Sequence, residues 1–276
     1  LGTLGADISE QTFYLDAECS RFQGKDIYFT KSSVGATQQA ILAAVMAQGV
    51  TKLHNCAKEP EVFWLCRYLR SMGALIKGEE TTEIMITGIR ELGPGNYTVP
   101  PDRIVAGTYL CAAAATSSEI TLRNVPEQEL QAFLEVYQKI GGQYQANSGT
   151  LEVNGKRAVQ PIALVETKNY PGFPTDLQAP LMAVLTGAQG RSSIRENIFD
   201  QRFGSAFQMN KMGADIRSAG DLRGGAALII AALMAEGETC ITEAELINRG
   251  YEHICEDLQA LGCRIWQSGS RGFEEL

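Results

Sequence analysis

One unit recurs four times along this chain, and the repeat limits the folds that it can adopt. Each copy opens at a polar or acidic residue, runs through an alanine-rich apolar segment and closes on a glycine before a strand-like segment. The four copies occupy residues 33–73, 102–141, 176–213 and 221–262. Glycines at such positions suit the left-handed residue that ends a helix, and segments 83–87 and 149–153 alternate as strands do. The pattern predicts an α/β fold built from β-α-β-α-β-β units that must pack together.

The spacing between copies also predicts where residues are absent. From a closing glycine to the next opening residue there are 29 positions (73 to 102) and 35 positions (141 to 176), but only 8 positions (213 to 221) before the fourth copy. We therefore expect a strand pair to be missing after Ile216. Residues 1–7 look like the closing end of an earlier unit, so we interpret the chain as incomplete at its N-terminus. Pro100 and Pro101 predict a boundary between domains at 1–100 and 101–276.

Composition excludes several classes of protein. The net charge of −8 argues against a nucleic-acid binder or a membrane-surface binder, because both need a basic face. The longest strongly apolar run, 226–235, is too short to cross a bilayer. Seven cysteines, an odd number without a C-x-x-C pair, are typical of reduced thiols in a cytoplasmic protein. With only two histidines we expect no histidine-rich metal site, and no cofactor is predicted.

The segment 170–180 carries the strongest candidate for chemistry. Two prolines and a glycine rule out a helix before Pro174. Asp176 then stands where a helix would begin, so its carboxylate can accept the first free backbone N–H groups. Alternatively, the rigid turn presents this carboxylate to a ligand as a general base or an orienting group.

Seven short segments occur together in an order that is characteristic of one family. They are residues 33–37, 55–61, 101–107, 170–179, 198–203, 221–223 and 248–252. Together they resemble the signature blocks of the UDP-N-acetylglucosamine 1-carboxyvinyltransferase (enolpyruvyl transferase) family, over most of the chain. The resemblance implies an inside-out α/β barrel with helices in the centre and sheets outside. Residues 1–100 would belong to the first domain, which bears the catalytic loop, and residues 101–276 to most of the second.

The resemblance also implies a reaction. The enolpyruvyl group of phosphoenolpyruvate would pass to a hydroxyl of UDP-N-acetylglucosamine with release of phosphate, the first committed step of peptidoglycan synthesis. Asp176 would be the catalytic carboxylate at the sugar hydroxyl. Residues expected to bind substrate are Lys31, Ser32, Ser33, Val34, Ile198, Arg202, Arg223 and Arg249. Lys31 to Val34 would hold the UDP-sugar, and the arginines suit phosphate and carboxylate.

For several of these residues the amino-acid pattern alone supports a structural role. Ser33 can simply cap a helix, and Ile198 can be a core residue. Glu59 and Glu61 are explained by capping at a helix start. The resemblance places Arg103 among the family's arginines near the cleft, where it would hold interdomain structure.

The remaining expectations concern activity. The family's proton donor is a cysteine, in some members an aspartate, on a loop that precedes the position of Leu1, and no cysteine here fits that loop. The chain would then carry the base but not the acid. Two alternatives stay open: a shikimate-3-phosphate enolpyruvyl transferase, and a non-catalytic paralogue or fragment that binds a nucleotide-sugar. The oligomeric state is not predicted.

Overall fold

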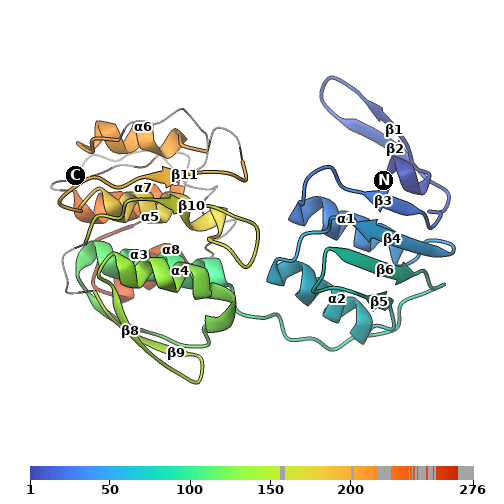
Figure 1. The fold of residues 1–276 in the computed structure, drawn as a ribbon, viewed down its shortest axis with the longest axis horizontal. Helices are drawn as coiled ribbons and strands as arrows, with labels where there is room; N and C mark the ends of the chain where they lie inside the picture. The colour runs from blue at the N-terminus through green and yellow to red at the C-terminus, as the bar shows by residue number, and fades with distance from the viewer. Residues whose placement is uncertain are drawn as a thin grey trace. The chain divides into compact units, whose positions relative to one another are not determined.

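A computed structural model describes most of the chain as two compact units (Figure 1). The described residues are 1–155, 159–199, 202–216, 225–235, 237, 239, 241, 247, 251 and 253–266. Unit 1 comprises Leu1–Pro100 and Asn169–Gly172, and unit 2 comprises Pro101–Lys168 and Phe173–Leu276. The chain therefore leaves unit 1 after Pro100 and contributes a four-residue loop to it again before continuing toward Asp176.

The first segment of unit 1 is a short helical turn followed by a hairpin. The 3-10 helix η1 (Gly2–Leu4) ends at Gly5, whose φ of 101° is left-handed. The antiparallel strands β1 (Asp7–Glu10) and β2 (Leu15–Glu18) follow, and all of their residues are exposed.

A four-stranded sheet with two helices forms the body of unit 1. In chain order the elements are β3 (Asp26–Tyr28), α1 (Val34–Ala44), β4 (Val50–His54), α2 (Pro60–Ser71), β5 (Leu75–Lys77) and β6 (Glu83–Thr87). The strands lie in the order β3-β4-β6-β5, with β3 and β4 parallel and the other neighbours antiparallel. The predicted β-α-β-α-β-β unit is therefore confirmed in this part of the chain.

The core of unit 1 lies between this sheet and its helices. Residues of β4 and β6 alternate between exposed and buried, as the sequence pattern predicted for 83–87. Leu53 and Ile84 from the sheet and Ile41 from α1 are each at most 1% exposed and belong to one cluster. Figure 1 shows α1 and α2 on the same face of the sheet.

Unit 2 begins with two helices and a three-stranded sheet. The elements are α3 (Arg103–Thr116), β7 (Glu119–Leu122), α4 (Glu127–Lys139), β8 (Gln143–Asn147) and β9 (Thr150–Asn154). The strands lie in the order β7-β9-β8 and are antiparallel. Asp102, where the second copy opens, caps α3, because its side chain accepts hydrogen bonds from the backbone N–H groups of Ile104 and Val105.

The described remainder of unit 2 consists of short strands and helices. It contains β10 (Val165–Glu166), η2 (Thr175–Leu177), α5 (Gln178–Leu185), β11 (Ile194–Arg195), α6 (Gly204–Lys211), α7 (Gly225–Met234) and α8 (Ile254–Ala260). The short strands β10 and β11 are parallel. Helices α3, α5 and α7 pack against one another, and all eight residues of α5 are buried. Its apolar composition therefore reflects burial on every side.

The closing glycines adopt the predicted conformation in all four copies. The φ angles of Gly73, Gly141, Gly213 and Gly262 are 98°, 98°, 98° and 93°. The predicted splice after Ile216 falls at 217–224, outside the described residues. In the described part of the chain, no helix is long and apolar enough to cross a membrane.

Candidate active site

The segment that carries Asp176 enters unit 2 as an extended chain and then forms a single helical turn. The bond between Tyr170 and Pro171 is cis. Pro174 is extended and precedes η2, which runs directly into α5. Neither η2 nor α5 has a side-chain cap hydrogen bond, so the prediction that Asp176 caps its helix is wrong. Its side chain is 53% exposed and is thus available to a ligand.

The partner of Asp176 is Arg202, which lies just before α6. Nη2 of Arg202 lies 2.6 Å from Oδ1 of Asp176, and Nη1 donates a 2.6 Å hydrogen bond to Oγ1 of Thr175. Only 11% of the arginine side chain is exposed, and its guanidinium lies 5.1 Å from the centroid of the Phe199 ring. One rigid fork therefore contacts two successive residues and sets the direction of the carboxylate.

Behind this pair lies Glu196, which the sequence did not single out. Its Oε2 accepts a hydrogen bond from the Thr175 hydroxyl at 2.9 Å. Its Oε1 accepts from the Thr167 hydroxyl and from the backbone N–H groups of Ile198 and Phe199, at 2.8, 2.8 and 3.1 Å. The carboxylate thus joins three segments of unit 2. A glutamate that follows the mostly polar residues 189–195 carries no distinctive pattern, so only the three-dimensional contacts reveal it.

Tyr251, from the predicted block 248–252, contacts helix α3. Its hydroxyl is 2.8 Å from Oγ1 of Thr108 on α3. Burial raises the pKa of the Tyr251 phenol, and the charges of Asp102 and Asp176 raise it further. An electrostatic influence of this kind falls off with distance, so the Tyr251 phenol is within electrostatic reach of Asp176.

The residues predicted to hold the UDP-sugar lie in unit 1. Lys31 and Ser33 are exposed, whereas Ser32 and Val34 are half-buried at the start of α1. Ser33 caps this helix, because its side chain accepts a 3.3 Å hydrogen bond from the N–H of Ala36. The capping role is therefore confirmed, and substrate binding by residues 31–34 stays a prediction.

The structure describes two of four other residues that the sequence singled out, Ile198 and Arg103. Ile198 is half-buried and is absent from the three core clusters of the described residues, so it is not the core residue that its apolar side chain suggested. Arg103, the first residue of α3, is 6% exposed. Arg223 and Arg249 lie outside the described residues.

Glu59 contacts the loop that precedes Asp176 rather than the start of its own helix. It occupies the N-cap position of α2 but makes no side-chain cap hydrogen bond, so the capping explanation is wrong for this residue. Its Oε1 instead accepts the backbone N–H of Tyr170 at 3.3 Å, within unit 1. Glu61 lies in the first turn of α2, where an acidic side chain interacts favourably with the helix dipole.

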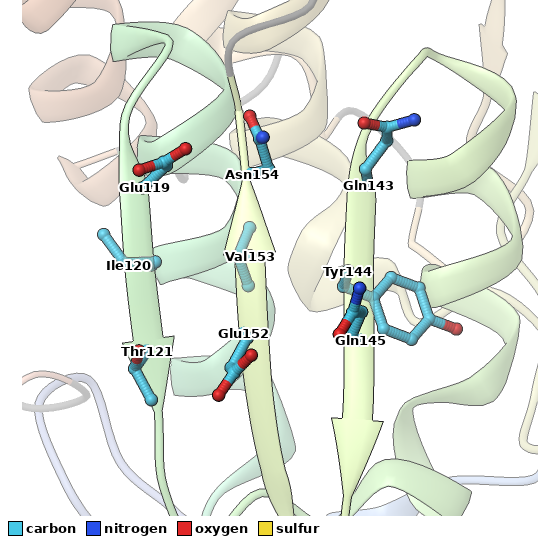
Figure 2. Close-up of a pocket in the computed structure, with 9 residues that line it drawn as sticks. All are labelled: Glu119, Ile120, Thr121, Gln143, Tyr144, Gln145, Glu152, Val153 and Asn154. Atoms are coloured by element: carbon cyan, nitrogen blue, oxygen red, sulfur yellow. The ribbon is translucent and has the colours of Figure 1, made fainter.

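A separate hollow lies over the sheet β7-β9-β8 and contains none of the predicted site residues. Figure 2 shows polar side chains on this face, among them Glu119, Thr121 and Glu152. The intervening Ile120 and Val153 belong to the core of unit 2. We interpret the hollow as the solvent face of an amphipathic sheet, because antiparallel sheets commonly have one face in water.

Comparisons with known proteins agree on one family. The family model described as EPSP synthase (3-phosphoshikimate 1-carboxyvinyltransferase) matches residues 1–258. The chain is 39% identical over 284 residues to UDP-N-acetylglucosamine 1-carboxyvinyltransferase 2 of Caldanaerobacter subterraneus, covering 96% of this chain and 68% of the relative. It is 40% identical over 286 residues to the enzyme of the same name from Clostridium tetani, covering 97% and 68%.

Solved structures show the same fold at lower identity. The enolpyruvyl transferase NikO from Streptomyces tendae matches with a TM-score of 0.79 and 22% identity over 95% of this chain and 69% of its own. EPSP synthase from Acinetobacter baumannii matches with a TM-score of 0.63 and 17% identity, over 94% and 68%. The sequence resemblance is therefore confirmed: the chain belongs to the enolpyruvyl (carboxyvinyl) transferase family, and UDP-N-acetylglucosamine 1-carboxyvinyltransferases are among its relatives.

Proposed function

We propose that this protein transfers the enolpyruvyl group of phosphoenolpyruvate to a hydroxyl of UDP-N-acetylglucosamine and releases phosphate. The observation that carries the proposal is the Asp176 carboxylate, half-exposed and oriented by Arg202, in a chain about 40% identical to enzymes named for this acceptor. Family membership makes the protein a transferase. The acceptor and the residue roles are inferred from that resemblance together with the geometry of the site.

The proposed chemistry is an addition followed by an elimination. The sugar hydroxyl attacks C2 of phosphoenolpyruvate while C3 is protonated, and phosphate then leaves as C3 loses a proton. Asp176 accepts the proton of the attacking hydroxyl, which is the task of a positioned general base. By resemblance to the family, a general acid on a loop donates the proton to C3.

Positive groups stabilise the phosphate and carboxylate of the donor during this reaction. We assign this role to Arg249 and Arg223 from the family blocks. Arg202 supports them chiefly by holding Asp176, because both of its terminal nitrogens already donate within the site. Lys31 and the residues up to Val34 bind the diphosphate of the sugar nucleotide, where a helix N-terminus favours negative charge.

We also propose an architecture for the two units. Each unit would be a barrel domain with its helices inside and its sheets outside, which fits the complete burial of α5. The domain limits are 1–100 and 101–276. Both substrates are polar phosphate compounds, so the reaction fits the cytoplasm and an early role in peptidoglycan synthesis, with consequences for cell shape and division. Nucleic acid has no part in it.

The acceptor is tested by measuring phosphate release from phosphoenolpyruvate in the intact protein. UDP-N-acetylglucosamine and shikimate-3-phosphate are supplied in separate reactions. The proposal predicts release with UDP-N-acetylglucosamine only. Release with shikimate-3-phosphate alone would support the alternative that the family model's description names, and binding of the nucleotide-sugar without release would support a non-catalytic paralogue.

A further inference from the structure

Hydrogen bonds connect Glu196 to Asp176 through Thr175 and Arg202. Arg202 donates to both the Asp176 carboxylate and the Thr175 hydroxyl. Because that hydroxyl already accepts from Arg202, its own proton is free to point to Oε2 of Glu196, at 2.9 Å. Thr175 therefore joins a buried cation on one side to an anion on the other.

The opposite oxygen of Glu196 holds a different part of the site. Oε1 receives the hydroxyl of Thr167 and the N–H groups of Ile198 and Phe199. The backbone N–H of Asn197 donates to Oγ1 of Thr167 at 2.8 Å, and its side-chain amide donates to the Thr167 carbonyl at 3.1 Å. The turn that carries Ile198 is thus tied to the residue that follows β10.

We propose that Glu196 is a positioning residue for enolpyruvyl transfer, acting through Thr175 on the Arg202–Asp176 pair. This inference rests on the proposed function, in which Asp176 is the base. One carboxylate sets the position of the Asp176 turn with Oε2 and of the Ile198 turn with Oε1. Residues that hold a catalytic group through a second layer of hydrogen bonds preserve the geometry on which the reaction rate depends.

Because each carboxylate oxygen of Glu196 holds a different turn, substitutions can separate its contact with the Asp176 turn from its contact with the Ile198 turn. In Glu196→Gln the amide oxygen can keep the three donors at the Oε1 position. The amide nitrogen then replaces Oε2 and can no longer accept the Thr175 proton, so the charge-assisted bond is lost and only a weaker N–H bond to the Thr175 hydroxyl oxygen can replace it. The Ile198 turn is preserved while the link to Asp176 is weakened. Thr175→Val breaks the same link from the other end, and Thr175→Ser restores the hydroxyl.

Steady-state phosphate release by the intact protein provides the first test. We expect Glu196→Gln and Thr175→Val to lower kcat by about tenfold to a hundredfold, with KM for UDP-N-acetylglucosamine within about threefold of wild type. Thr175→Ser should recover most of that loss. Glu166→Gln is the matched control, because Glu166 lies on β10 and pairs with Arg195 at 3.0 Å and Lys168 at 3.4 Å, apart from this network. It should keep the wild-type kcat.

A second measurement does not depend on turnover. The bonds to Thr175 and Asp176 restrict the guanidinium of Arg202, so its 15N side-chain signals should show slow rotation in wild type and Thr175→Ser. Rotation of the Arg202 guanidinium should be faster in Glu196→Gln and Thr175→Val. The signals are assigned to Arg202 by their absence from the spectrum of Arg202→Lys.

The outcomes separate this inference from the proposed function. An inactive wild type with the expected changes in Arg202 rotation would reject the function and keep the network. Wild-type kcat in Glu196→Gln, or unchanged Arg202 rotation, would overturn the positioning role.

Discussion

Arg202 lies 2.6 Å from Asp176 although the two residues are 26 positions apart in the sequence. Arg202 is largely buried, whereas Asp176 is half-exposed. The arginine therefore acts as a fixed support, and the carboxylate keeps one side open to solvent and ligands. An ion pair with an exposed partner contributes little to folding, typically below about 1 kcal/mol. The pair therefore orients the Asp176 carboxylate more than it stabilises the fold.

Replacing Arg202 with lysine tests whether the paired guanidinium contacts with Thr175 and Asp176 matter for turnover. A lysine keeps the positive charge but cannot span both Thr175 and Asp176, because its ammonium is a single point of contact. We expect kcat to fall by about tenfold to a hundredfold, and the free energy of unfolding to change by less than about 2 kcal/mol. Phosphate release and denaturant unfolding measure the two effects. Unchanged turnover would show that charge alone is sufficient at this position.

A substitution at Gly107 tests how tightly the turn that carries Asp176 packs against α3. A Cβ at this position would lie 2.9 Å from Cδ2 of Leu177 and closer still to Cδ1, and Leu177 is fully buried beside Asp176. Gly107→Ala should lower the free energy of unfolding by about 1–3 kcal/mol and reduce kcat.

Gly35→Ala in α1 provides the control for Gly107, because a Cβ there meets nothing within 4 Å. Alanine favours a helix over glycine, so this variant should gain about 0.5–1 kcal/mol. Equal stability changes in the two variants would contradict the packing described for Leu177.

The free energy of unfolding should depend on pH through the thiols of Cys56 and Cys66. Burial raises the pKa of Cys56 from 9.0 to about 11 and that of Cys66 from 9.0 to about 12. Above pH 9 the unfolded chain therefore loses these protons first, which favours unfolding. The contribution is complete below pH 9 and is lost as the pH rises through 11–12. Urea unfolding from pH 8 to pH 11 should show this fall, and the Cys56→Ala/Cys66→Ala double variant should show a smaller one.

Sequence reasoning succeeded where the determining interactions are local. Ser33 caps its helix through an N–H group three residues away, so the residue type and its position are sufficient to predict the bond. The left-handed glycines that close each copy are equally local, as Gly73 and Gly141 show.

The same reasoning failed where a distant partner competes for the side chain. Asp176 and Glu59 both occupy positions at which a carboxylate can cap a helix, yet one pairs with Arg202 and the other receives the N–H of Tyr170, 111 positions away. A charged partner or a backbone donor outcompetes the cap, and its position depends on the folded chain. Glu196 was missed for the same reason, because its donors come from three separate segments.

The Asp176→Asn variant tests most directly whether Asp176 is the base. Asparagine keeps the shape of the side chain but cannot accept the proton of the sugar hydroxyl. Phosphate release with phosphoenolpyruvate and UDP-N-acetylglucosamine should fall by about 10²–10⁴-fold, the range for loss of a general base. The free energy of unfolding should change by less than about 1 kcal/mol, because Asp176 is 53% exposed. Phosphate release at the wild-type rate in this variant would contradict the account.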